Sequence, residues 1–411
     1  MISLTIALRS VWKNRRRSLA TLLSIAVGFT AINLFGGYIQ DTYTGLRDTA
    51  IHYEGLGHVT VAKPGFFERG GVNPAKYLFT RAELETLRRV VESQPGVVLT
   101  TPFLGVSGLI SNGKLSTIFL ADGEEPENAA RLRQLGSAGA TVSSDALDPR
   151  RVTAGYVSDG LGSLLSIKQG DSATLLSSTL DGQTNALDLD VLGTWDTGNS
   201  ATNDKLLRLP LEYVQRLLDT DGASRVVVLL KPGADADAFR ARLLPILRDA
   251  GLTTEIKTWV ELSVFYRQVK NLFDLIFLFL FSIVFVVVLM GIVNTLSMSV
   301  MERVREIGTL RAIGMKRGGI LRLFALEGGI LGLLGCLVGV VLTLVIGGVI
   351  NGSNLSYIPP SSSSPVPLTA AIMPVAMLVL LALLSTVSML AACVPARRAA
   401  QLQIVDALGH V

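Results

Sequence analysis

The sequence predicts a membrane protein with four transmembrane helices and a large exported α/β domain between helices 1 and 2. The first observation behind this prediction is the composition: 49% of the 411 residues are hydrophobic, 17% are charged, and the mean hydropathy is +0.48. Soluble globular chains and disordered chains typically contain a larger fraction of charged residues than this. The second observation is the placement of four long apolar runs, one near the start of the chain and three near its end.

The first apolar run covers residues 18–39 and contains no charged residue. As a helix, its 22 residues span about 33 Å, which is enough to cross the hydrocarbon core of a bilayer. The run follows a basic segment, residues 1–17, that we expect to be amphipathic and cytoplasmic. A cleaved signal peptide is the alternative, but the length of the run and the lack of a small-residue cleavage site favour a membrane anchor.

Three further spans are predicted in the last third of the chain, at residues 269–299, 320–350 and 369–394. Each is long enough to cross a bilayer as a helix. Two cysteines, Cys336 and Cys393, lie inside these spans, so no disulfide is predicted to hold the polar part of the chain.

The polar segments between the spans differ in charge, and this difference sets the orientation. Residues 300–319 contain five basic residues and the tail 395–411 contains two, whereas residues 351–368 contain no Lys or Arg. By the positive-inside rule, the N-terminus, 300–319 and 395–411 face the cytoplasm and the loop 351–368 lies outside. Residues 40–268 then also lie outside, and we expect a multi-pass protein of the inner (cytoplasmic) membrane.

The exported segment alternates strand-like and helix-like stretches, which indicates an α/β or α+β domain. The predicted strands are His58–Ala62, Val97–Thr101, Leu115–Ala121, Asp188–Leu192 and Arg225–Leu230. The predicted helices are Arg81–Glu92, Pro210–Leu218 and Asp235–Arg248. A capping box of Thr80 with Glu83 marks the start of the first of these helices. The outer loop 351–368 is expected to be irregular because it is rich in Pro and Ser.

A long helix is predicted to join the exported segment to the second span. Between Thr258 and Met290 there is neither Gly nor Pro, and an apolar stripe continues from polar into fully apolar sequence. Such a stalk would carry a movement between the membrane and the exported domain. The alternative is a helix that breaks at Lys270 or Asn271.

Several kinds of chemistry find no support in the sequence. The net charge of +4 is too small for a nucleic-acid footprint. A P-loop-like spacing at Gly108, Gly113 and Lys114 has Leu115 where a magnesium-binding Ser or Thr belongs, and a strand rather than a helix follows it. The three histidines form no metal-ligand pattern. We therefore expect a non-catalytic chain with no cofactor of its own.

The most specific pattern is the segment 294–335, which reads NTLSMSVMERVREIGTLRAIGMKRGGILRLFALEGGILGLLG. Shorter motifs lie before the first span (WKNRRR) and after the last (VPARRAA). These motifs closely resemble those of the permease family of MacB, FtsX and the lipoprotein-releasing LolC and LolE proteins. In the exported part, Ser166–Asp171 and Asp190–Trp195 resemble the MacB-like periplasmic core domain. The resemblance extends over essentially the whole chain.

This resemblance implies a permease subunit of a type VII ABC transporter that works with a separate ATPase subunit, where ATP and magnesium bind. The family implies a second permease copy or paralogue, contact with membrane lipid and a possible periplasmic or outer-membrane partner, but no nucleic acid. ATP-driven motion would reach the exported domain and move lipoproteins, lipids, peptides or other envelope compounds. The alternative is an FtsX-like signalling subunit that activates an exported partner such as a cell-wall hydrolase.

By the same resemblance, residues 300–319 hold the coupling helix that docks on the ATPase. The implied coupling residues are Val300, Glu302, Arg303, Val304, Arg305, Glu306, Ile307, Gly308, Leu310, Arg311 and Gly314. Val300, Val304 and Ile307 form an apolar stripe at helical spacing, and the charged residues beside them are suited to contact another chain. An interfacial helix lying on lipid is the alternative.

Membrane-helix packing is predicted at Glu327 and at four glycines of the third span. Gly328 with Gly332, and Gly335 with Gly339, give two G-x-x-x-G spacings, which allow either close packing or a dimer face. Glu327 lies several residues inside the span, where a charged acid needs a partner, and Arg322 or a neighbouring helix would supply it.

The predicted topology can be tested with single cysteines and an impermeant thiol reagent. In intact spheroplasts, Ser362→Cys and Asp181→Cys should react because both positions are predicted to lie outside, whereas Thr309→Cys should not. Labelling of the Thr309 variant alone would invert the orientation.

Overall fold

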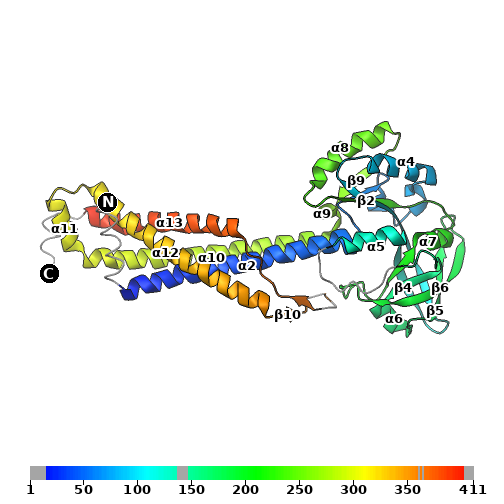
Figure 1. The fold of residues 1–411 in the computed structure, drawn as a ribbon, viewed down its shortest axis with the longest axis horizontal. Helices are drawn as coiled ribbons and strands as arrows, with labels where there is room; N and C mark the ends of the chain where they lie inside the picture. The colour runs from blue at the N-terminus through cyan, green and yellow to red at the C-terminus, as the bar shows by residue number, and fades with distance from the viewer. Residues whose placement is uncertain (1–14, 137–146, 360–361, 363–364, 402–411) are drawn as a thin grey trace. The chain divides into compact units, whose positions relative to one another are not determined.

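The computed structural model describes residues 15–136, 147–359, 362 and 365–401. The predicted N-terminal segment up to residue 14, most of the Ser361–Ser364 run and the tail beyond residue 401 lie outside the described residues. The chain divides into two units: a membrane unit of residues 1–42, 270–356 and 367–411, and an exported unit of residues 43–269 and 357–366. Each unit is described by itself below (Figure 1).

The membrane unit contains the four predicted spans as long helices. Their bounds are α2 Arg15–Asp48, α10 Val264–Glu302, α12 Arg317–Gly352 and α13 Pro374–Gln401, with the short α11 Val304–Ala312 between α10 and α12 (Figure 1). In the described part of the chain, these four are the helices long and apolar enough to cross a membrane. This confirms the predicted fold class. Helices α2, α10 and α12 extend beyond the predicted spans at both ends because they continue through polar residues, whereas α13 begins at Pro374, inside the predicted span 369–394, and ends later than predicted.

The four glycines of the third span pack inside the chain. A Cβ atom on Gly328 or Gly332 would meet Ala392 or Ser388 of α13 at 2.5–2.7 Å. A Cβ on Gly335 would lie 2.7 Å from Ile25 of α2, and one on Gly339 would lie 2.8 Å from Phe29. The two G-x-x-x-G spacings therefore bring α12 against α13 and then against α2. These glycines are used within one chain and do not form a free dimer face.

The exported unit is built on one nine-stranded sheet. The strands are β1 Val59–Ala62, β2 Val97–Ser111, β3 Ser116–Glu124, β4 Ala154–Ser158, β5 Ser172–Ser178, β6 Thr184–Trp195, β7 Leu206–Pro210, β8 Arg225–Leu230 and β9 Glu255–Thr258. Its helices are η1 Thr49–Tyr53, α3 Phe66–Arg69, η2 Pro74–Tyr77, α4 Arg81–Glu92, α5 Pro126–Gln134, α6 Asp159–Leu165, α7 Leu211–Leu218, α8 Ala236–Asp249 and α9 Trp259–Leu262. The loop 351–368, predicted to be irregular, contains two short strands, β10 Ser356–Tyr357 and β11 Val366–Pro367.

Part of the sheet closes on itself. Because β2 pairs with both β3 and β5, six strands form a ring in the order β2, β3, β7, β4, β6, β5. The alternating burial of β5 shows the two faces, with Ala173 and Leu175 inside and Thr174 and Leu176 outside. Helix α7 adds Tyr213, among other residues, to the enclosed apolar core.

A second core lies on the other part of the sheet. The first half of β2 pairs with β8, which continues to β1 and β9, and helices α4 and α8 supply apolar side chains to this core. Helix α4 has the predicted bounds and the predicted capping box of Thr80 with Glu83. Its buried face consists of Leu84, Leu87 and Val91, at helical spacing.

The predicted stalk is one helix over most of its length, but it begins later than predicted. Helix α9 ends at Leu262, Ser263 is extended (φ −76, ψ 92), and α10 begins at Val264. The continuous helix predicted from Thr258 is therefore wrong at its start, because a second capping box of Thr258 with Glu261 ties down the short α9. No break occurs at Lys270 or Asn271, where Lys270 pairs with Asp274 at 2.5 Å.

The glycine packing gives a prediction with a matched control on the same helix. Gly335→Ala should lower the free energy of unfolding by about 1–3 kcal/mol because the new methyl group overlaps Ile25. Gly348→Ala should be neutral or slightly stabilising, since nothing lies within 4 Å of its Cβ position. Thermal unfolding in detergent, followed by reaction of the buried Cys336 thiol with a dye, measures both. Equal midpoints for the two variants would contradict the packing.

Candidate functional site

The predicted coupling segment 300–319 is divided into several elements. Helix α10 continues to Glu302, Arg303 leaves helical geometry (φ −113, ψ 14), and α11 runs from Val304 to Ala312. The chain turns at Gly314, whose φ of +104 suits a residue without a side chain, and α12 begins at Arg317. The segment is thus an elbow of two turns around one nine-residue helix, and it is not a single helix.

One face of α11 is buried against the membrane unit. Val304 is 4% exposed, Ile307 is 3% exposed, and Gly308 is buried beside them. Ile307 and Val300 share an apolar cluster with Ile320, Phe324, Ala396 and Ala400 of α12 and α13. The resemblance implied that Val300, Val304 and Ile307 belong to the ATPase-coupling site, and all three are buried in this chain. Because α11 folds back on its own bundle, the stripe is used inside the chain.

The opposite face of the elbow is open and carries charges of both signs. Glu302, Arg305, Glu306 and Thr309 are exposed, and Leu310 and Arg311 are half-buried. Ile313, beside the exposed Gly314, is 80% exposed. The sequence did not lead us to include Ile313 among the coupling residues, although a large apolar residue next to a glycine at a turn can indicate an exposed contact residue. Of the implied coupling residues, Glu302, Arg305, Glu306 and Gly314 are the exposed ones.

Arg303 turns towards the protein interior. Its Nη1 lies 3.5 Å from Oε2 of Glu327, and its Nε lies 3.4 Å from Oε2 of Glu306. Glu327 is 3% exposed, so it is a buried acid. A neighbouring element was one of the two predicted sources of its partner, and Arg303 is that partner, whereas Arg322 is not. Losing one member of such a buried pair typically costs about 3–5 kcal/mol.

A small polar hollow adjoins this ion pair. It is lined by Ser18, Thr295, Leu296, Ser299, Glu302, Glu327 and Leu331, from α2, α10 and α12. The hydroxyls of Thr21 and Thr295 are 2.5 Å apart, which joins α2 to α10. Ser299 Oγ is buried without a hydrogen-bond partner among the described residues. The sequence did not predict this cluster because its residues come from three separate helices.

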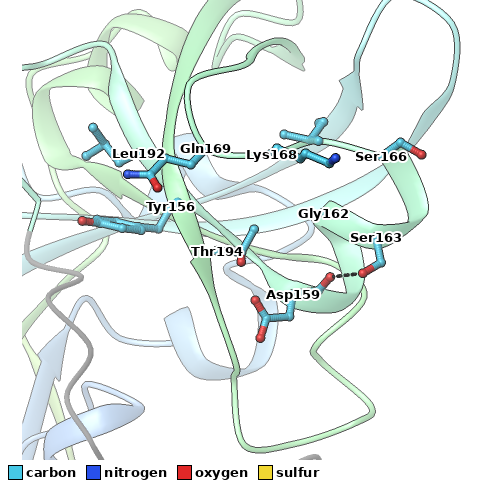
Figure 2. Close-up of a pocket in the computed structure, with 11 residues that line it drawn as sticks. Tyr156, Asp159, Gly162, Ser163, Ser166, Lys168, Gln169, Leu192 and Thr194 are labelled. Atoms are coloured by element: carbon cyan, nitrogen blue, oxygen red, sulfur yellow. Dashed lines mark hydrogen bonds between the residues drawn. The ribbon is translucent and has the colours of Figure 1, made fainter.

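A second hollow lies in the exported unit, between the two segments that resemble the periplasmic core domain. Its volume is ≈ 680 Å³, and Figure 2 shows Tyr156, Asp159, Lys168, Gln169 and Thr194 among the residues around it. Ser163 donates a hydrogen bond to the main-chain oxygen of Asp159 (Figure 2). Sequence reasoning identified the segments but not Tyr156 or Asp159, which reach the hollow from β4 and α6.

The structure also shows where the P-loop-like residues and the histidines lie. Gly113 and Lys114 occupy the turn between β2 and β3, so a strand follows them as predicted. Burial lowers the pKa of His58 to about 4, and its Nδ1 accepts a hydrogen bond from the Leu230 amide. His52 Nδ1 lies 2.8 Å from the Leu132 oxygen. Within the described ranges, no group of three His, Cys, Asp or Glu side chains is arranged to hold a metal ion.

Two family models match the chain. The MacB-like periplasmic core domain matches residues 18–246, and the FtsX-like permease C-terminal domain matches residues 277–404. The crystal structure of the periplasmic region of MacB from Actinobacillus actinomycetemcomitans is 12% identical, covers 50% of this chain and 89% of that one, and has a TM-score of 0.36.

Individual relatives agree with these models. LolC of Neisseria meningitidis, a lipoprotein-releasing system transmembrane protein, is 23% identical over 83% of this chain and 80% of its own length. The macrolide export protein MacB of Salmonella choleraesuis is 30% identical over 35% of this chain and 23% of its own. An uncharacterized ABC transporter permease of Methanocaldococcus jannaschii is 27% identical over 37% of this chain, and the match covers only 39% of that protein. Because the first model alone covers more than half of the residues, the chain belongs to the family of ABC transporter permeases that includes MacB, LolC and LolE.

Proposed function

We propose that this chain is the transmembrane subunit of a MacB- or LolCDE-like ABC transporter of the inner membrane. It transmits the ATP-driven motion of a separate ATPase to its exported domain, which moves lipoproteins, lipids, peptides or other envelope compounds. A second permease copy or paralogue and a periplasmic or outer-membrane partner complete the assembly. The observation that carries this proposal is the elbow at α11, with one face anchored in the membrane unit and the other face open and charged.

The docking step uses the open face of the elbow. Arg305 and Glu306 offer charges of both signs, and Ile313 offers an apolar side chain that is 80% exposed. An apolar anchor with charged residues around it is the usual composition of a protein–protein contact. The ATPase, which carries ATP and magnesium, therefore meets this chain at residues 302–314, and the buried stripe below them keeps α11 in place.

The transmission step uses the connections of α11 to the long helices. The Arg303–Glu327 pair ties the junction of α10 and α11 to α12, so a displacement of α11 is passed to both helices. Helix α10 is continuous from Val264 to Glu302 and includes residues of both units. A helix without a break is stiff along its axis, because each turn is hydrogen-bonded to the next.

The exported unit has a surface suited to an apolar cargo or partner. Across four neighbouring strands, Ile118, Leu109, Leu176 and Ala186 are directly paired in register and all point outward from the closed ring. Ile118 is 61% exposed, Leu109 43% and Leu176 38%. A continuous row of exposed apolar side chains on a soluble surface typically marks an interaction site. The relatives LolC and MacB are named for lipoprotein release and macrolide export, and both kinds of compound have apolar parts.

The docking step predicts a specific effect of reversing one charge. Glu306→Lys should reduce co-purification of the ATPase subunit about fivefold or more, since it reverses a charge in the contact and also removes the ion pair with Arg303, while the buried apolar side chains of α11 are unchanged. Glu85→Lys, which reverses an exposed acid in the exported unit, is the matched control and should leave co-purification unchanged. If both variants retain normal ATPase association and turnover, Glu306 does not belong to the docking surface.

The transmission step predicts that ATP hydrolysis and export can be separated. Replacing Gln268 and Val269 with Gly-Pro removes a backbone donor from α10 and permits a bend, at a local cost of about 3 kcal/mol or more. The ATPase should still bind and hydrolyse ATP, because the elbow is unchanged, but export should fail. An Ala-Ala replacement at the same two positions keeps the helix and should retain export. Normal export with Gly-Pro would rule out transmission through α10.

A further inference from the structure

Three arginines near the predicted cytoplasmic ends of α12 and α13 have no role in the function proposed above. Arg322 was one of the two predicted sources of a partner for Glu327, but Arg303 takes that place. Arg397 and Arg398 belong to the motif that follows the last span. Within the described ranges, none of these three arginines forms an ion pair with an acid.

Helices α12 and α13 run antiparallel and keep one register where they pack. A Cβ atom on Gly332 would meet Ser388 of α13. One on Gly328, four residues earlier, would meet Ala392, four residues later. Two further steps of four residues give pairs whose side chains share one buried apolar cluster: Phe324 with Ala396, and Ile320 with Ala400. The register therefore extends to the ends of both helices.

This register places Arg322 and Arg398 at the same height. Each lies two residues from the contact positions before and after it, which is about 200° around a helix of 3.6 residues per turn. Each side chain is therefore on the face of its helix that points away from the other helix. The same faces carry exposed apolar side chains deeper in the spans, Leu333 on α12 (42% exposed) and Val394 on α13 (52% exposed). These faces meet lipid.

The height of the arginines matches the headgroup layer of the membrane. Helix α13 has no charged residue between Pro374 and Ala396, about 35 Å of helix, and Arg397 and Arg398 follow directly. A hydrocarbon core is about 30 Å thick, so both arginines reach the lipid phosphates at its edge. Arg322 shares this height, and its long side chain can extend along the helix to hold the guanidinium at the same level.

A guanidinium at this level is suited to an anionic partner from the lipid. Its planar donors match two phosphate oxygens, and an ion pair of this kind is stronger than an ordinary hydrogen bond. A zwitterionic headgroup carries an ammonium group beside its phosphate, which offsets the attraction. An anionic headgroup keeps its net charge and attracts basic residues at the membrane surface.

We propose that Arg322, Arg397 and Arg398 bind anionic phospholipids of the cytoplasmic leaflet. Arg322 holds one headgroup on the outer face of α12, and the two arginines of α13 hold another. Glu327 lies five residues beyond Arg322 on the same helix, about 7.5 Å deeper, so the bound lipid fixes the depth of the helix that anchors the elbow. This inference deepens the proposed function, because it rests on the membrane subunit and names the lipid that it binds.

The full chain, purified in a neutral detergent, tests the site with two lipids. The measured quantity is the midpoint of thermal unfolding as dioleoylphosphatidylglycerol or dioleoylphosphatidylcholine is added. Phosphatidylglycerol should raise the midpoint, because a ligand that binds only the folded chain stabilises it. Phosphatidylcholine should raise it much less. Inorganic phosphate should leave it unchanged, since the free ion is not held at the edge of the hydrocarbon.

Substitutions identify the arginines that bind. Arg322→Gln and Arg398→Gln should each raise the phosphatidylglycerol content needed for half of the shift about fivefold, the size expected for one basic residue at an anionic surface. Arg322→Lys keeps the charge and should retain most of the affinity. Arg242→Gln, which removes an exposed arginine of α8 in the exported unit, is the matched control and should titrate like the unchanged chain. Without lipid, all four variants should unfold at the midpoint of the unchanged chain.

Equal shifts with the two lipids, a shift with inorganic phosphate alone, or the same loss of affinity in Arg242→Gln would each overturn the proposal. So would Arg322→Gln and Arg398→Gln variants that titrate normally, or that lose stability only in the absence of lipid. The titration contains no ATPase, so its failure would refute the lipid site and leave the transporter assignment in place. A normal titration by a chain with which no ATPase co-purifies would refute the transporter assignment alone.

Discussion

The buried ion pair of Arg303 and Glu327 is the constraint on which the candidate coupling site depends. Glu327 lies in a helix that crosses the membrane, where an acid without a cation would be expensive to keep charged. Arg303 meets it by leaving helical geometry, and that departure separates α10 from α11 and gives the elbow its shape. The apolar stripe of α11 then turns inward and the charged residues turn outward. Burying this ion pair costs desolvation free energy, but it fixes the direction of α11 and so determines which of its side chains are exposed.

Contacts between helices of the same chain also hold the rest of the membrane unit together. Glycines on α12 allow α13 and α2 to approach closely, and the paired threonines Thr21 and Thr295 join α2 to α10. These contacts pack α2, α12 and α13 against neighbouring helices of the same chain. Helix α10 keeps an exposed outer face, which carries Asn294.

Much of the architecture could be predicted from the sequence, because the physical signals behind it are local. Apolar length and the distribution of basic residues gave the number and order of the spans, and the capping box at Thr80 placed α4. Non-local pairing could not be predicted in this way: the closed strand ring depends on β2 meeting both β3 and β5, and the partner of Glu327 lies across a turn. The stripe of Val300, Val304 and Ile307 had the correct period, but periodicity says only that a face is buried, not which chain buries it.

Strand β2 has a consequence for how the exported unit unfolds. Its 15 residues run through both cores: Leu104, Val106 and Ile110 fill the interior of the ring, whereas its earlier residues pair with β8 in the other half. If either half melted, the other would lose β2 as the neighbour of its adjacent strands. The two cores therefore form one cooperative folding unit rather than two independent domains. A load applied to either half is therefore resisted by the hydrogen bonds that β2 makes in both.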